Sequence, residues 1–290
     1  MKRLFLAAAL AALMLVPASS ASAALTGEYA KFNTCPFSNP SVGICLYAES
    51  TTGQFTVGKK TVPLVKPQVL KGGIIDPEGL FGPLTFVAPT DGLVLSKAAQ
   101  PVPGGLLGIT APSWWPQILK DLFNETINNG FTGVTATVEL AGSASNVKVS
   151  ILNAATASGT AFALPVKVKL DNPFLGSSCY IGSNSNPVKL NLTTGTTAPP
   201  LPNKPISGNP GEGGEDPSSP SRFIFLKKNR LVDNSFSAPG ANGCGGFLFS
   251  WAVDPLVDSI LGTPSPAGTN TAILEGTTWL GNAELLRPLL

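Results

Sequence analysis

The sequence contains no histidine among its 290 residues. Without an imidazole, the chain cannot form a Ser-His-Asp triad, a Cys-His pair or a histidine-ligated metal site. Charged residues are also scarce, at 12% of the chain, which is about half the usual share. Acid–base chemistry would have to rest on carboxylates or lysines. A non-catalytic role is therefore the stronger prediction, and we expect no cofactor and no bound metal ion.

The N-terminus has the layout of a secretory signal peptide. A short basic start precedes an apolar run at 4–16, and an Ala-x-Ala pattern follows at 21–23. That pattern is typical of a signal-peptidase site, and the run is shorter than the roughly 20 residues that span a bilayer. We expect a signal peptide at 1–23, with an uncleaved anchor as the less favoured alternative. The mature protein is then secreted or extracellular, with cell-surface association as one option, and has no integral membrane segment.

The rest of the chain has no excess of charge of either sign. Of the 19 basic residues, Lys2 and Arg3 belong to the expected signal peptide, so the remainder equal the 17 acidic residues in number. Nucleic acids and anionic membranes attract proteins with clustered excess cations. The composition therefore argues against a nucleic-acid partner. We expect a cell-wall polysaccharide or another envelope protein instead.

Four cysteines follow the expected cleavage point, at Cys35, Cys45, Cys179 and Cys244. An even number of cysteines behind a signal peptide favours disulfides. No Cys-x-x-Cys spacing is present for zinc or thiol redox chemistry. Three connectivities are possible. We predict Cys35–Cys45 and Cys179–Cys244, because these pairs close the shorter loops.

Alternation of apolar and polar residues is the main secondary-structure signal. It is clearest at 132–140, 162–170 and 188–192, where it predicts strands with one buried face. Shorter or weaker strands are predicted at 44–48, 54–57, 61–65, 146–152 and 223–226. The similar segments 165–172 and 187–195 predict a pair of neighbouring strands. Short strands separated by Gly, Pro and Asn are typical of an antiparallel β-sandwich or a barrel-like domain.

One amphipathic helix is predicted after Ser113, with Pro116 in its first turn and Gly130 at its end. Apolar residues from Trp115 to Ile127 recur at helical spacing, which predicts a stripe that covers one end of the sheet. Trp114 lies beside this stripe. It is therefore a candidate ligand-binding aromatic residue.

The C-terminal part contains a second, shorter helix signal. Residues 255–261 are predicted to be helical, with Asp254 as the N-cap. The apolar run at 246–253, which includes Trp251, is predicted to lie in the core.

A long segment rich in Pro, Gly and Ser interrupts the strand pattern at 196–221. It lacks periodicity and cannot bury enough apolar surface to offset its ordering entropy, so it is predicted to be a flexible loop or linker. The Cys179–Cys244 pair would bridge this segment. We therefore expect a single mainly β domain at 24–290, with one amphipathic helix and this one long loop.

Asp76, Glu78 and Asp91 form the densest acidic region in a turn-rich part of the chain. A glycosidase needs two carboxyl groups about 5–10 Å apart. These three residues are candidate ligand-binding groups, and they support the alternative of a carboxylate-dependent, glycan-active hydrolase. Solvated carboxylates in surface turns are the simpler interpretation, and we assign no catalytic residue.

Three stretches carry a resemblance: TCPFSNPSVGICLYAESTTGQFTVG at 34–58, TVPLVKP at 61–67 and NPFLGSSCYIG at 172–182. Together they resemble a group of exported β-rich proteins of high-GC Gram-positive bacteria for which no activity is known. The resemblance implies export and the cysteine framework. It carries no catalytic or binding residue.

The sequence thus predicts a secreted, disulfide-stapled β-rich protein with a non-catalytic binding or structural role at the cell envelope. The glycan-active hydrolase is the first alternative. An oligomeric surface or pore component is the second, because the even alternation of the strands permits such an assembly.

Overall fold

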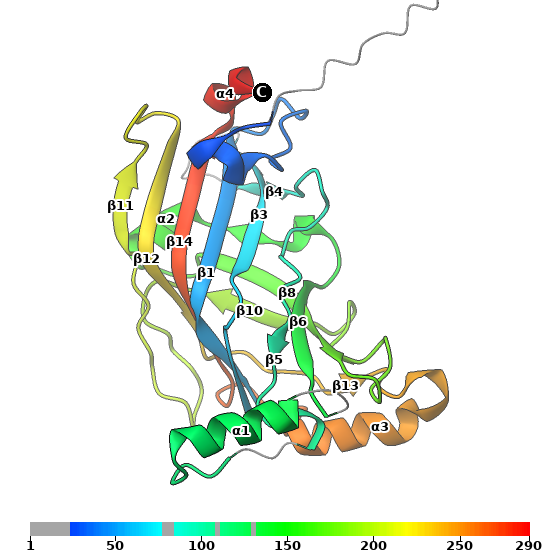
Figure 1. Cartoon of the computed structure of the whole chain (residues 1–290). Coiled ribbons are helices and arrows are strands. Elements are labelled where there is room, and N and C mark those ends of the chain that lie inside the picture. The colour runs from blue at the N-terminus through cyan, green and yellow to red at the C-terminus, as the bar shows by residue number, and fades with distance from the viewer. Residues whose placement is uncertain (1–23, 77–83, 108–110, 129–131) are drawn as a thin grey trace, which may run out of the picture.

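The computed structural model describes residues 24–76, 84–107, 111–128 and 132–290 (Figure 1). The expected signal peptide and Glu78 lie outside the described residues. The fold is mainly β, as predicted, with two antiparallel sheets and a few short helices. Of the two predicted forms, it is the sandwich and not a closed barrel.

The first sheet has the strand order β11-β12-β14-β1-β3-β4, and β2 also pairs with β1. Its strands are β1 (Ile44–Val57), β2 (Lys60–Pro63), β3 (Gln68–Ile75), β4 (Thr85–Val87), β11 (Glu212–Glu215), β12 (Phe223–Asp233) and β14 (Thr271–Asn282). The predicted strands at 44–48 and 54–57 form one continuous strand, β1. Its two main neighbours, β3 and β14, were not predicted.

The second sheet has the order β13-β9-β8-β6-β5, and β7 and β10 both pair with β8. Its strands are β5 (Gln100–Pro101), β6 (Thr135–Leu140), β7 (Lys148–Val149), β8 (Phe162–Asp171), β9 (Tyr180–Ile181), β10 (Val188–Leu192) and β13 (Ala241–Asn242). The pairing of β8 with β10 is antiparallel and confirms the predicted pair of neighbouring strands.

The helical elements are short apart from two. They are η1 (Gly27–Phe32), η2 (Gly105–Leu107), α1 (Gln117–Asn128), η3 (Ala144–Asn146), α2 (Ile151–Thr156), α3 (Gly246–Leu261), α4 (Ala283–Leu286) and η4 (Arg287–Leu289). The prediction of one strand over 146–152 is wrong, because Ser150 ends that pattern. Its side chain accepts a hydrogen bond from the Asn153 N–H and caps α2.

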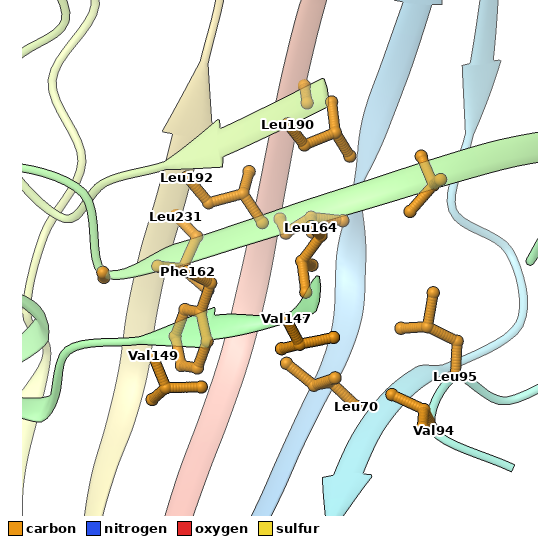
Figure 2. Packing of buried hydrophobic residues seen from close by; sticks show 14 of the residues in the cluster. Leu70, Val94, Leu95, Val147, Val149, Phe162, Leu164, Leu190, Leu192 and Leu231 are labelled. Atoms are coloured by element: carbon orange, nitrogen blue, oxygen red, sulfur yellow. The ribbon is translucent and has the colours of Figure 1, made fainter. Parts of the chain in front are cut away.

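The sheets meet through their inner faces, and the strands of one sheet run across those of the other (Figure 2). Leucine and phenylalanine side chains from both sheets fill this part of the interface: Phe162 and Leu164 from β8, Leu190 and Leu192 from β10, Leu70 from β3 and Leu231 from β12. Burial of each such side chain stabilises the fold by about 1.5–3 kcal/mol.

Two disulfides stabilise the fold, Cys35–Cys45 and Cys179–Cys244, and both predicted pairings are confirmed. All four cysteines are therefore bonded. The second disulfide joins the start of β9 to the turn before α3. By chain entropy, the shorter loop contributes about 3 kcal/mol and the longer one about 4 kcal/mol.

The segment at 196–221 contains structure that its composition did not predict. Its last part includes β11, which pairs with β12. Earlier in the segment, the Asn203 N–H donates to the Gly268 carbonyl at 3.0 Å, and the Gly208 N–H donates to the Gly195 carbonyl at 2.7 Å. These backbone bonds hold the segment against β12, against the residues that precede β14 and against Gly195, directly before the segment.

Two predictions for the C-terminal part are wrong. The helix α3 begins at Gly246 and continues through Pro255, so Asp254 lies inside it and is not its N-cap. Trp251 is 79% exposed on α3 and does not lie in the core.

Candidate functional site

A cavity lies between the two sheets, and residues of α3 form part of its wall. The helix α3 lies at one end of the sandwich (Figure 1). The cavity has a volume of about 110 Å³, counted as the space that the centre of a water-sized sphere can occupy. The described residues that line it are apolar or glycine, except Lys60, Gln68 and Gln100. Protein interiors have few voids larger than a water molecule, so a cavity with this wall is a candidate binding site.

Small side chains on the second sheet contribute to the empty space. Alternation along β6 and β8 directs Ala136, Val138, Val166 and Val168 to the inner face of the second sheet. These side chains are shorter than the leucines and phenylalanines that fill the region in Figure 2. The two sheets are held apart by the larger residues, so the smaller ones leave a gap.

The two glutamines add little polarity to the wall, because their side-chain amide groups form hydrogen bonds with backbone groups. The Gln100 side-chain oxygen accepts from the N–H groups of Val65 and Lys66, and its nitrogen donates to the Lys66 carbonyl at 2.8 Å. The Gln68 side-chain nitrogen donates to the Ser96 carbonyl at 2.6 Å. The wall therefore presents an almost wholly apolar surface to a ligand.

Lys60 is the one charged residue among the described residues that line the cavity. It lies at the start of β2 and is partly buried, and this burial lowers the pKa of its ammonium group. The adjacent Lys59 is exposed and points elsewhere, since its Nζ donates to the Ser259 carbonyl on α3 at 3.3 Å. Lys60 therefore places one cation at a wall that is otherwise apolar.

The helix α3 has one side on the cavity and the other side in solvent. Val257, Ile260 and Leu261 line the cavity. On the outer side, Phe247 is 97% exposed and Leu248 is 70% exposed. In α3, which lies wholly within the described residues, every exposed residue except Ser259 is apolar.

Both acidic residues of α3 have backbone partners within the protein. The Asp254 carboxylate accepts from the Cys244 N–H at 2.7 Å and from the Gly243 N–H at 3.2 Å. The Asp258 carboxylate accepts from the Ala241 N–H at 2.6 Å. Both carboxylates thus bind backbone N–H groups that precede the helix, and this fixes the polar side of α3 against the protein.

The helix α1 also exposes apolar residues, and it lies at the same end of the sandwich as α3 (Figure 1). Trp115 and Phe123 pack edge to face at 5.6 Å and are partly buried. Ile118 and Leu122 are 78% and 62% exposed, so the prediction that the whole stripe packs on the sheet is wrong. The candidate Trp114 is 79% exposed. The side chain of Ile127 lies outside the described residues.

The structure does not bring the candidate carboxylates Asp76 and Asp91 together. Asp91 forms an ion pair with Lys71 on β3. Burial opposes ionisation of Asp91, but hydrogen bonds from Lys71 and from the Leu93 N–H outweigh it and lower the pKa of the carboxyl. Lys71 lies in β3 and Asp76 directly follows that strand, five positions later, which is about 16 Å at the usual rise of a strand. Asp91 therefore has a structural partner far from Asp76.

Sequence reasoning identified neither the cavity nor Lys60. The outward exposure of the aromatic run at 247–251 had no clear signal in the sequence. Helical spacing places Phe247 and Trp251 on the same side of the helix as Asp254 and Asp258, since these four positions are separated by four, three and four residues.

No protein-family model, curated protein or solved structure matches this chain. Among the described residues, no helix is long and apolar enough to cross a membrane. In the same part of the chain, no three Cys, Asp or Glu side chains gather as a metal ion would require. The function must therefore be inferred from the geometry of the cavity and of α3.

Proposed function

We propose that the protein binds an apolar ligand, such as an acyl chain, in the cavity between its two sheets. It does so without catalysis, as a secreted protein at the cell envelope. The observation that carries this proposal is the wall of the cavity, where Val, Leu, Ile, Phe and Ala side chains surround the space. Ligand pockets in proteins are typically apolar, with a few polar groups that orient the ligand.

The size and chemistry of the cavity favour an apolar occupant over water. An apolar cavity of about 150 Å³ stays dry and takes up benzene, and a buried water needs two to four polar partners. This cavity has a similar volume, about 110 Å³, and its glutamine amides are engaged by the backbone. A hydrocarbon segment would gain dispersion contacts with the wall that water cannot replace.

Lys60 supports a ligand with an anionic head group. Lys60 lines an otherwise apolar space and is partly buried, so a carboxylate or phosphate beside it would be only partly screened by solvent. A fatty acid or another acyl chain with an anionic head matches both features of the site.

The envelope location is supported by the cysteines and by the N-terminal sequence. Disulfides persist in oxidising compartments outside the cytoplasm, and the two disulfides of this protein are compatible with such a location. The signal-peptide pattern and the resemblance to exported proteins of high-GC Gram-positive bacteria point the same way.

A fluorescence titration with parinaric acid, a long-chain fatty acid that fluoresces in apolar surroundings, tests the proposal. Ala136→Leu fills the cavity from β6 and should abolish saturable binding. Ala163→Leu is the matched control, because Ala163 lies between the buried Phe162 and Leu164 and faces outward from β8. Equal binding by both variants and the wild type would contradict the proposal.

A further inference from the structure

We propose that the exposed face of α3 docks on the surface of a lipid bilayer. Phe247, Leu248 and Trp251 would lie among the lipid acyl chains near the head groups. This face is the outer side of α3, and the cavity is on its inner side. Docking therefore does not depend on a ligand in the cavity.

The exposed apolar area is larger than a solvent-facing helix normally carries. Phe247, Phe249 and Trp251 are 97%, 61% and 79% exposed, and together they present about 450 Å² of aromatic surface. Leu248 and Leu256, at 70% and 59%, extend this patch. The largest apolar patch on a typical monomer is about 300–600 Å² and is often functional. We therefore infer that a binding partner covers this patch.

The composition of this face favours lipid over a second copy of the chain. A standard protein interface buries about 800 Å² on each partner and has a polar rim with about ten hydrogen bonds. The exposed side of α3 is one ridge of a helix, and Ser259 is its only exposed polar residue. Acyl chains cover such a ridge without requiring hydrogen bonds. Trp, Phe and Leu are the residues that interfacial helices insert.

The charges around α3 fit anionic head groups. Asp254 and Asp258 bind backbone N–H groups on the inner side, so α3 turns neither carboxylate toward the surface. The exposed Lys59 lies at the C-terminal end of the helix, where its Nζ donates to the Ser259 carbonyl. Although residues 24–290 contain equal numbers of basic and acidic side chains, this face combines an uncharged apolar ridge with a cation at its edge.

The residues in and directly before α1 add exposed apolar side chains at the same end of the molecule. Trp114 lies just before α1 and Ile118 lies in its first turn, and both are more than three-quarters exposed. Both helices lie at the end of the sandwich opposite α4 (Figure 1). A bilayer that meets this end could receive apolar side chains from both helices.

Flotation of the purified protein with vesicles of phosphatidylglycerol and phosphatidylcholine in equal parts tests the proposal. The wild type should float with the vesicles. The double variant Leu248→Ser/Trp251→Ser should float at least about tenfold less, because it removes two of the exposed apolar side chains. Leu285→Ser is the control and should float normally, since Leu285 is an exposed leucine on α4 at the opposite end.

Two further measurements make the result decisive. In sedimentation without lipid the wild type should be a monomer, and a dimer that the double variant abolishes would overturn the proposal in favour of a self-interface. Unchanged flotation of a folded double variant would overturn it as well. Ala136→Leu should still float, and the double variant should still bind parinaric acid without vesicles, so failure of docking and failure of the cavity proposal are distinguishable.

Discussion

The carboxylate of Asp254 in α3 accepts a hydrogen bond from the backbone N–H of Cys244, ten residues earlier in the chain, at 2.7 Å. Cys244 is itself bonded to Cys179, so the polar side of α3 is held to the second sheet by a covalent bond and a charged hydrogen bond. This arrangement gives the helix its orientation, with Val257 toward the cavity and Phe247 toward solvent.

Asp254→Asn should destabilise the protein by about 1–3 kcal/mol. The variant keeps one acceptor oxygen but sets an amide N–H₂ against the N–H of Gly243 or Cys244. Asp121→Asn is the control, because Asp121 is exposed and accepts from the exposed Gln117, so its effect should stay within about 0.5 kcal/mol. Urea unfolding measures both, and an equal loss of stability would contradict the anchoring role of Asp254.

The two disulfides should differ in their contribution to stability. Replacement of Cys179 and Cys244 by serine should cost about 4 kcal/mol, and replacement of Cys35 and Cys45 about 3 kcal/mol, if chain entropy dominates. The separations of 65 and 10 residues set this order. Urea unfolding of each double variant, with the other disulfide intact, gives the two values. A larger cost for the short loop would contradict the entropic explanation.

The buried carboxylate Asp216 should make stability depend on pH through Tyr29. Burial opposes ionisation of Asp216, but hydrogen bonds from the Tyr29 hydroxyl at 2.6 Å and from backbone N–H groups outweigh it and lower its pKa. A lowered pKa in the folded state contributes stability above the unfolded pKa of about 3.9, and this contribution is lost as the pH falls through the folded value.

Tyr29→Phe should therefore cost about 1.5–3 kcal/mol near neutral pH and less at an acidic pH, because the contribution is lost as the pH falls through the lowered folded-state pKa of Asp216. Tyr47→Phe is the control. Its ring packs on Trp279 at 5.8 Å, and its hydroxyl should contribute little at either pH. Urea unfolding at the two pH values measures the effect. A cost for Tyr29→Phe that does not change with pH would contradict the link to Asp216.

Lys60 should select the anionic head of the ligand. Lys60→Met should weaken binding of parinaric acid by about tenfold and leave binding of its uncharged methyl ester unchanged. Lys59→Met should affect neither ligand, because Lys59 points to the Ser259 carbonyl. Since burial lowers the pKa of Lys60, binding of the acid should weaken as the pH rises, before an exposed lysine would lose its proton. An equal loss for the acid and its ester would contradict this role.

The sequence predicted the elements whose pattern is strictly local. The strands β6, β8 and β10 alternate along their whole length, and the cysteine spacing predicted both disulfides. The strands β3 and β14 were missed because glycines interrupt their alternation. Gly276 lies where the β14 backbone approaches β1 so closely that a Cβ would be 1.8 Å from the Glu49 carbonyl oxygen. The need for a glycine there depends on a strand more than 200 residues away.

The candidate site was harder to predict, since a cavity is a property of packing. Ala136 and Val168 are ordinary inward-facing residues in the sequence, and only the spacing of the two sheets shows that they leave a gap. Trp251 was placed in the core because apolar residues are usually buried. The structure exposes it, and the hydrogen bonds of Asp254 and Asp258 anchor α3 to the preceding residues without covering Trp251.

The most direct measurement is a crystal structure of the protein with a fatty acid that carries bromine at the end of its chain. The proposed function predicts an anomalous bromine signal between the sheets, enclosed by β6 and β8, with the carboxylate near Lys60. A bromine signal found only on the outer surface would contradict it. An empty cavity in a crystal grown with an excess of the brominated fatty acid would contradict it as well.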